Sequence, residues 1–283
     1  MLVGVPSEIK SQEYRVGLTP GSVHELVYHG HQVIVQKGAA LNIGIEDSEY
    51  TRVGAEIVDS AAEIFARADM IVKVKEPQPN ECKMLREGQI LFTYLHLAPD
   101  LLQTELLQQS GCIAIAYETV TDRYGRLPLL SPMSEVAGRL SIQAGAKCLE
   151  VAHGGKGVLL GGVAGVEAAK VVVLGGGVVG TNALRIAIGM EANVTVIDLS
   201  LDRLRELDFH YGASLNTIYS THENIAKYVA DADLVIGAVL VPGASAPRLV
   251  TKEMISSMSK GSVVVDVAID QGGCFETSRP TTH

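Results

Sequence analysis

A strand, a glycine-rich turn and an acidic residue follow one another in the order that a dinucleotide-binding site requires. The run Lys170–Leu174 leads into Gly175, Gly177 and Gly180, which match Gly-x-Gly-x-x-Gly, and helical spacing continues beyond them. Glycines here let a pyrophosphate approach the backbone, where the first N–H groups of a helix carry a partial positive charge. Asp198 ends the next expected strand, 23 residues after Gly175, and can accept hydrogen bonds from an adenosine ribose. Because this carboxylate would repel a 2′-phosphate, the motif predicts NAD rather than NADP as the cofactor.

Three chemically capable side chains follow expected strands in the first half of the chain: Arg15, Lys75 and His96. The carboxyl ends of parallel strands share one sheet edge, so all three can face one cleft. Two cations there would suit a substrate carboxylate, with Arg15 as a planar fork and Lys75 as a point charge. His96 can move a proton at neutral pH. The residues alone leave open that each is an ordinary surface cation or a structural histidine.

The second half offers further candidates at strand ends. Val239 and Leu240 follow the expected strand Leu234–Ala238, and Asp270 lies three residues beyond the expected strand Ser262–Val267. The nicotinamide end of a dinucleotide is expected at this edge of the sheet. Asp270 is therefore a candidate for the chemistry, with a solvated loop aspartate as the alternative.

Short apolar runs alternate with helical stretches, which is the pattern of repeated βαβ units in a parallel sheet. Ser60 and Asp100 stand where helix N-caps are expected, and Gly30 and Gly111 stand where a helix gives way to a strand. The remaining expected strands are Leu2–Val5, Gln32–Val35, Met70–Val74, Ile90–Tyr94, Cys112–Ala116, Asn193–Ile197 and Leu215–Tyr219, and the expected helices of the first half lie near Pro20–Tyr28, Ser60–Ala66 and Pro99–Gln109.

A polar, proline-containing segment, Thr121–Pro132, interrupts this pattern and predicts a domain boundary. We expect residues 1–130 to form a substrate-binding catalytic domain and residues 131–283 to form an NAD-binding domain. Helical spacing over Ser134–Val151 predicts a long connecting helix with Ser134 as its N-cap. The fold class is thus α/β, with two Rossmann-like domains on parallel sheets, one of them a doubly wound NAD-binding domain.

Composition narrows the class of protein. Hydrophobic residues make up 47% of the 283 residues and charged residues 19%, which excludes an intrinsically disordered chain. The net charge is −9 and no basic run occurs, so nucleic acid and acidic membranes are not expected partners. We expect a cytoplasmic protein without a bound metal, because no apolar run reaches transmembrane length and the four cysteines are widely spaced, at Cys82, Cys112, Cys148 and Cys274.

Several longer motifs resemble those of NAD-dependent L-alanine dehydrogenases, and they span the chain. The glycine motif is one of them. The others are Val5–Lys10 with Arg15–Pro20, Val74–Pro77, Tyr94–Ala98, Ser131–Gly138 and Val265–Cys274.

This resemblance implies the oxidative deamination of L-alanine to pyruvate and ammonia, with NAD⁺ as hydride acceptor, and the reverse amination. It implies that Arg15 and Lys75 hold the carboxylate and carbonyl of pyruvate. His96 would be the general acid and base, and Asp270 would help to orient the water or amine at the reacting carbon.

The resemblance also implies a set of cofactor contacts and a homo-oligomer, a hexamer. Beside the glycines, the implied contacts are Ser134, Val178 and Val179 at the phosphates, Asp198 at the ribose, Arg203 and Ser220 at the adenine, Val239, Leu240 and Val267 at the nicotinamide ribose, and Arg279 near the phosphates.

Members of this family continue for several tens of residues beyond the position that corresponds to His283. By this comparison, we expect the first domain to lack a segment that completes it. The alternative interpretation is an inactive or partner-dependent NAD(H)-binding module, related to the nucleotide-binding part of a proton-translocating transhydrogenase. Such a module would not need Arg15, Lys75 and His96, whose presence favours the dehydrogenase.

Overall fold

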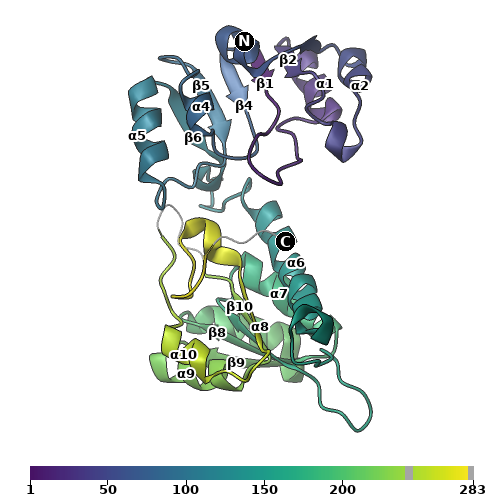
Figure 1. Cartoon of the computed structure of the whole chain (residues 1–283), viewed down its shortest axis with the longest axis vertical. Helices are drawn as coiled ribbons and strands as arrows, with labels where there is room; N and C mark the ends of the chain where they lie inside the picture. The colour runs from purple at the N-terminus through teal and green to yellow at the C-terminus, as the bar shows by residue number, and fades with distance from the viewer. Residues whose placement is uncertain (240–244, 280–283) are drawn as a thin grey trace. The chain divides into compact units, whose positions relative to one another are not determined.

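The computed structural model describes residues 1–239 and 245–279, and it divides the chain into two compact units (Figure 1). The first unit is Met1–Leu129 and the second is Leu130–His283. Each unit contains its own parallel sheet with helices packed against it. The expectation of an α/β chain with two Rossmann-like domains is confirmed.

The sheet of the first unit has six parallel strands in the order β3-β2-β1-β4-β5-β6. This order reverses direction between β1 and β4, so their carboxyl ends form a topological switch point, where doubly wound folds bind ligands. The strands are β1 (Leu2–Val5), β2 (Gln32–Gln36), β3 (Glu56–Val58), β4 (Met70–Val72), β5 (Ile90–Thr93) and β6 (Ile113–Ala116). The helices are α1 (Pro20–Tyr28), α2 (Asp47–Arg52), α3 (Ala61–Arg67), α4 (Pro79–Cys82) and α5 (Leu101–Ser110), with short 3₁₀ helices η1 (Leu41–Ile43) and η2 (Tyr117–Thr119).

Local capping chemistry sets several boundaries in this unit. The side chains of Ser60 and Asp100 accept hydrogen bonds from the third residue after them, at the starts of α3 and α5. Gly111 ends α5 in the left-handed conformation at φ +66°. At Gly4 in β1, an added Cβ would lie 2.4 Å from Ile64 of α3, so only glycine lets this helix pack so closely on the strand.

The sheet of the second unit has five parallel strands in the order β11-β10-β7-β8-β9, with a switch point between β7 and β10. The strands are β7 (Lys170–Leu174), β8 (Asn193–Asp198), β9 (Leu215–Tyr219), β10 (Leu234–Gly237) and β11 (Val263–Asp266). The helices are α6 (Ser131–Leu149), α7 (Val178–Gly189), α8 (Leu201–Tyr211), α9 (His222–Asp231) and α10 (Lys252–Ser257), with 3₁₀ helices η3 (Val151–His153), η4 (Gly212–Ser214) and η5 (Val267–Gln271).

Helix α6 begins earlier than its sequence pattern predicts. It starts at Ser131 with Pro132 in its first turn, and Leu130 is the N-cap residue without a side-chain hydrogen bond. Ser134 is a buried residue inside the helix, so its prediction as N-cap is wrong. Proline is favoured in the first turn because the missing N–H has no intrahelical partner there, and this signal outweighed the serine.

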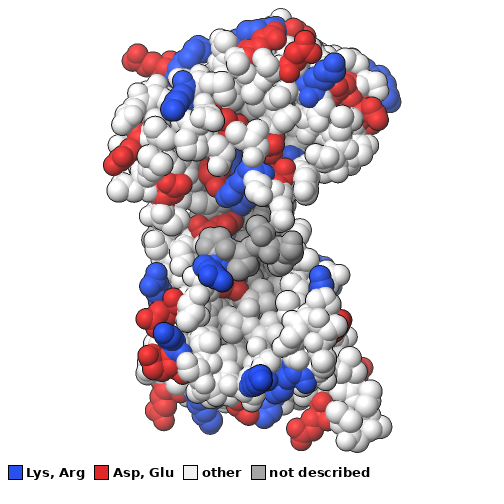
Figure 2. All heavy atoms as spheres, in the orientation of Figure 1, with Lys and Arg blue, Asp and Glu red and all other residues white. Residues whose placement is uncertain are grey.

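Among the residues that the structure describes, no helix is long and apolar enough to cross a membrane. On the face shown in Figure 2, lysine and arginine side chains are interspersed with aspartate and glutamate rather than gathered by sign.

Candidate functional site

The switch point of the first unit collects the predicted substrate residues. Arg15 lies in the loop between β1 and α1, Lys75 lies three residues beyond β4, and His96 lies three residues beyond β5. The loop after β1 passes close to the end of β4. A Cβ at Gly17 would lie only 2.6 Å from the carbonyl oxygen of Val72, so this approach requires glycine. Arg15, Lys75 and His96 therefore belong to loops at the carboxyl end of the sheet, where the sequence pattern placed them.

Glu13 holds the guanidinium of Arg15 in a two-point contact. Its Oε2 and Oε1 accept hydrogen bonds from Arg15 Nη2 at 2.6 Å and Nε at 2.8 Å. The Arg15 side chain stays 46% exposed, whereas that of Glu13 is 8% exposed. Burial alone would raise the pKa of the Glu13 carboxyl, but the hydrogen bonds and charge of Arg15 outweigh it, so that this pKa is lowered. Glu13 thus fixes the orientation of the guanidinium, while part of the Arg15 side chain remains exposed to solvent.

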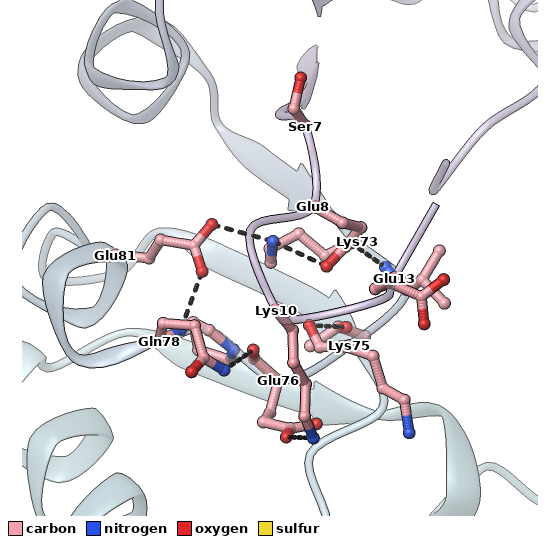
Figure 3. A network of polar contacts seen from close by, with 12 residues as sticks. Ser7, Glu8, Lys10, Glu13, Lys73, Lys75, Glu76, Gln78 and Glu81 are labelled. Carbon is pink, nitrogen blue, oxygen red and sulfur yellow. Dashed lines mark hydrogen bonds and ion pairs between the residues drawn. The ribbon is translucent and has the colours of Figure 1, made fainter. Parts of the chain in front are cut away.

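A buried ion cluster ties the loop after β1 to the loop after β4 (Figure 3). Lys73 is fully buried, and its Nζ lies 3.1 Å from Glu8 Oε2 and 2.9 Å from Glu81 Oε1. The other oxygen of Glu8 accepts a hydrogen bond of 2.7 Å from the backbone N–H of Val74. Burial raises the pKa of Glu8, and the positive charge of Lys73 opposes this rise. The cluster fixes the backbone on which Lys75 stands.

Lys75 itself is anchored through its carbonyl oxygen, which accepts a hydrogen bond of 2.9 Å from Thr93 Oγ1 at the end of β5. In Figure 3 its side chain extends away from the Lys73–Glu81 pair. The expected strand Met70–Val74 stops at Val72 in the structure, which places Lys75 in the loop rather than at the last strand position.

His96 has an unusual backbone, with φ at +50°. Residues other than glycine rarely occupy this region unless surrounding contacts hold them there. The buried carboxylate of Glu118 accepts hydrogen bonds from His96 N at 2.6 Å and from Leu95 N at 3.0 Å. The imidazole Nδ1 lies 3.6 Å from Glu76 Oε2, and the ring stacks against that of Tyr94. These contacts fix the backbone of His96 and the plane of its ring at this end of the sheet.

The glycine motif of the second unit forms the expected turn between β7 and α7. Gly175 has φ at +96°, and a Cβ at Gly180 would lie 1.8 Å from the carbonyl oxygen of Gly175. By contrast, the space around a Cβ at Gly177 is open to 4 Å. Gly175 and Gly180 are therefore needed to build the turn, and Gly177 leaves room at the start of α7 for a phosphate to approach the backbone.

Asp198 at the end of β8 lies directly beside this turn. Its Oδ2 accepts a hydrogen bond of 2.6 Å from Gly176 N, and its Oδ1 accepts one of 2.7 Å from Ser200 N. Each carboxylate oxygen keeps capacity for a further donor, as a ribose ligand needs. Arg203 in α8 donates to the carbonyl oxygen of Gly176 at 2.7 Å and to Thr181 Oγ1 at 2.6 Å. The residues of the turn thus fit the adenosine end of a dinucleotide.

Most of the other predicted residues of the second unit, the cofactor contacts and the catalytic candidate Asp270, lie at the same end of the second sheet. Val178 and Val179 open α7, Val267 opens η5 after β11, and Asp270 is an exposed residue of η5. Val239 follows β10 and lies against Gly175, while the backbone N–H of Ser220 donates to the carbonyl oxygen of Asp198 at 3.0 Å. Ser134 is buried in the first turn of α6, and Arg279 is exposed. Leu240 lies outside the described residues.

Sequence reasoning missed the carboxylates Glu8, Glu13, Glu76 and Glu81, which lie beside basic side chains, and Glu118, which holds the backbone of His96. One signal was present, because Lys73 interrupts the apolar run Met70–Val74 and a buried lysine requires an acidic partner. Within the described residues, no group of three or more histidine, cysteine, aspartate or glutamate side chains has the arrangement of a metal site.

The chain has two parallel sheets, each with a topological switch point, and a glycine turn of the dinucleotide-binding type. These are the features of a two-domain oxidoreductase that uses a nicotinamide cofactor. Family models agree with this class: residues 4–137 match "Alanine dehydrogenase/PNT, N-terminal domain" and residues 141–283 match "Alanine dehydrogenase/PNT, C-terminal domain". The chain belongs to the alanine dehydrogenase/PNT family. The resemblance inferred from the motifs is confirmed.

Curated relatives are similar along the whole chain. The alanine dehydrogenase of Methanococcus maripaludis is 56% identical over 284 residues, covering 100% of this chain and 76% of the relative. That of Bacillus subtilis is 54% identical, covering 100% of this chain and 75% of the relative. The chain therefore spans about three quarters of the length of these relatives.

Solved structures show the same relationship. An L-alanine dehydrogenase superposes with a TM-score of 0.90 at 52% identity, covering 100% of this chain and 78% of that chain. A transhydrogenase from Sinorhizobium meliloti superposes with a TM-score of 0.81 at 30% identity, covering 99% of this chain and 82% of that chain.

Proposed function

We propose that the protein catalyses the reversible oxidation of L-alanine, in which L-alanine, NAD⁺ and water give pyruvate, ammonium, NADH and a proton. The observation that carries this proposal is the placement of Arg15, Lys75 and His96 on loops at one end of the first sheet. Relatives named alanine dehydrogenase that are more than half identical support the choice of substrate.

In this proposal the first unit binds the amino acid. Arg15, held by Glu13, offers N–H groups to the substrate carboxylate, and Lys75 supplies a second positive charge beside it. Such a clamp orients the α-carbon, because a two-point contact with a planar carboxylate removes its rotational freedom.

His96 moves the protons of the reaction. It accepts a proton from the ammonium or the attacking water and returns one in the reverse direction. Asp270 of the second unit is proposed to orient the water or amine at the reacting carbon.

The second unit is proposed to hold NAD, which supplies the hydride acceptor when bound. The N–H groups at the start of α7 bind the pyrophosphate beside Gly177, and Asp198 accepts the ribose hydroxyls. The contacts proposed from the family resemblance are Ser134, Val178, Val179, Arg203, Ser220, Val239, Leu240, Val267 and Arg279. A homohexamer and a cytoplasmic location stay predictions from the resemblance, which sedimentation and cell fractionation can test.

The test follows NADH absorbance with L-alanine and NAD⁺, and its consumption with pyruvate and ammonium. We expect turnover in both directions, with little from D-alanine. The variant His96→Ala is expected to lose turnover, while the NADH Kd measured by fluorescence titration stays nearly unchanged. Tight NADH binding without any turnover by the unmodified protein would instead favour the NAD(H)-binding module related to transhydrogenase.

A further inference from the structure

We infer that Glu76 is a positioning residue for His96. Its carboxylate accepts a hydrogen bond from Nδ1–H of His96, so that Nε2 is the nitrogen that exchanges protons with the substrate. The inference rests on the proposed function, because it specifies how His96 acts in that reaction. Figure 3 shows Glu76 in the loop after β4, beside Lys10 from the loop after β1.

The first argument is an unsatisfied oxygen. Glu76 Oε2 is buried and has no hydrogen-bond partner among the described residues. His96 Nδ1 lies 3.6 Å away, just beyond hydrogen-bond range, and the side chains of Glu76 and His96 are only 13% and 15% exposed. Leaving a buried carboxylate oxygen without a donor is costly, so a small rotation that brings Nδ1–H into hydrogen-bond range is favoured.

The second argument is that Glu76 is ionised wherever the enzyme would work. Its other oxygen, Oε1, pairs with the ammonium of Lys10. Burial alone would raise the pKa of this carboxyl, but the neighbouring imidazole of His96 and the ammonium of Lys10 outweigh it and lower the pKa to about 2. A carboxylate can only accept, so the imidazole nitrogen that faces it must carry a proton.

Glu118 and Tyr94, the other polar residues described around His96, make their hydrogen bonds with backbone groups and not with the imidazole nitrogens. Glu118 accepts hydrogen bonds from the backbone N–H groups of Leu95 and His96, and the hydroxyl of Tyr94 donates to the carbonyl oxygen of Leu129 at 2.6 Å. The Tyr94 ring stacks on the imidazole at a centroid distance of 6.0 Å and an interplanar angle of 18°. Backbone and ring plane are therefore fixed by these residues, and Glu76 decides which nitrogen carries the proton.

The direct test reads the tautomer of His96. In protein with ¹⁵N-labelled histidine, long-range ¹H–¹⁵N correlations distinguish protonated from unprotonated ring nitrogens, and comparison with His96→Gln assigns the resonance. We expect neutral His96 to carry its proton on Nδ1. A proton on Nε2 in the unmodified protein would overturn the inference, and this result requires no variant of Glu76.

The second test separates orientation from binding. In Glu76→Leu, of similar size but without an acceptor, we expect loss of the tautomer preference and a fall in kcat of roughly 10- to 100-fold, part of the ~10²–10⁴ that positioned proton transfer contributes. KM for L-alanine and the NADH Kd should change less than about threefold, since binding residues stay intact. Glu76→Gln, whose amide oxygen still accepts from Nδ1, should keep the tautomer and recover part of kcat.

Glu56→Leu is the matched control, because Glu56 is a 54% exposed carboxylate of the same unit that pairs with Arg67. It should leave both tautomer and kcat unchanged. A Glu76→Leu protein that folds and keeps kcat would contradict the inference. If the unmodified protein does not oxidise L-alanine at all, the proposed function fails, and the NMR result still decides the tautomer separately.

Discussion

The backbone N–H of His96 donates a hydrogen bond of 2.6 Å to Oε1 of Glu118, a buried residue 22 positions further along the chain. This contact holds His96 in the left-handed region at φ +50°. Gln103 of α5 adds a second tie, because its amide donates to the carbonyl oxygen of Leu95 at 3.0 Å. The position of the imidazole thus depends on a carboxylate that takes no part in the proposed reaction itself.

Replacing Glu118 should therefore reduce both stability and turnover. Glu118→Ala removes the acceptor of the buried N–H of Leu95 and the partly buried N–H of His96, and a buried donor left unsatisfied costs about 1–3 kcal/mol. We expect a lower urea midpoint and a lower kcat, with NADH affinity unchanged. Glu105→Ala on the exposed side of α5 is the control and should alter neither. A Glu118→Ala protein with full stability would show that water or another group satisfies these N–H donors.

The sequence predicted best the parts of the fold that local chemistry determines. The strand Lys170–Leu174 and the helix Pro20–Tyr28 have the predicted bounds, because an apolar run before a glycine turn and a proline at the helix start act within a few residues. The edge strand β3 (Glu56–Val58) was missed. It has three residues, of which one is buried, and its pairing with β2 rather than its own pattern makes it a strand.

The site residues likewise divide into those that local sequence signals predict and those that only the folded chain brings together. Arg15, Lys75 and His96 were found because each follows a strand, and parallel strands share their carboxyl edge. Glu76 and Glu118 could not be found in this way, because they meet His96 through the folding of loops. They lie 20 and 22 residues from His96 in other loops and elements, beyond the length over which a helix or strand repeat relates two side chains.

Two glycines of the nucleotide turn should respond differently to an added methyl group. Gly180→Ala places Cβ 1.8 Å from the carbonyl oxygen of Gly175, so we expect destabilisation beyond the ~1–3 kcal/mol of an ordinary overpacked core. Gly177→Ala meets no atom within 4 Å and should lower the urea midpoint only slightly, because alanine is less favourable than glycine at the N-cap of α7. Its methyl group should nevertheless weaken NADH binding at least about tenfold, because it lies where the pyrophosphate approaches. Fluorescence titration and urea unfolding measure the two effects, and unchanged NADH affinity in Gly177→Ala would refute this placement.

Asp198 should determine the choice between NAD⁺ and NADP⁺. We expect the unmodified protein to use NADP⁺ poorly, because a 2′-phosphate would lie against the carboxylate that accepts from Gly176 N and Ser200 N. Asp198→Asn removes the charge at nearly constant size. It should raise kcat/KM for NADP⁺ relative to NAD⁺ by at least about tenfold, equivalent to roughly 1.4 kcal/mol. Asp202→Asn, an exposed aspartate of α8, serves as control. Equal rates with both cofactors in the unmodified protein would disprove the role of Asp198.

The ion cluster at Lys73 should make stability depend on pH in a predictable direction. Lys73→Met leaves the buried carboxylates of Glu8 and Glu81 without their ammonium, and breaking a buried pair in this way costs about 3–5 kcal/mol at pH 7. The pKa of Glu8 is already raised by burial in the folded state, and losing Lys73 should raise it further. A carboxyl whose folded pKa lies above its unfolded value destabilises the fold at higher pH, and this cost disappears as pH falls towards 4.5.

The deficit of Lys73→Met relative to the unmodified protein should therefore be largest near pH 7 and smaller near pH 5 in urea unfolding. Adding Glu8→Gln should restore part of the lost stability at pH 7, because one buried negative charge is removed while its amide oxygen can still accept from Val74 N. Lys156→Met breaks a more exposed pair with Asp233 and should show a small deficit. A Lys73→Met deficit that stays constant between pH 5 and pH 7 would mean that Glu8 does not titrate in this range, and the electrostatic account of the cluster would then be wrong.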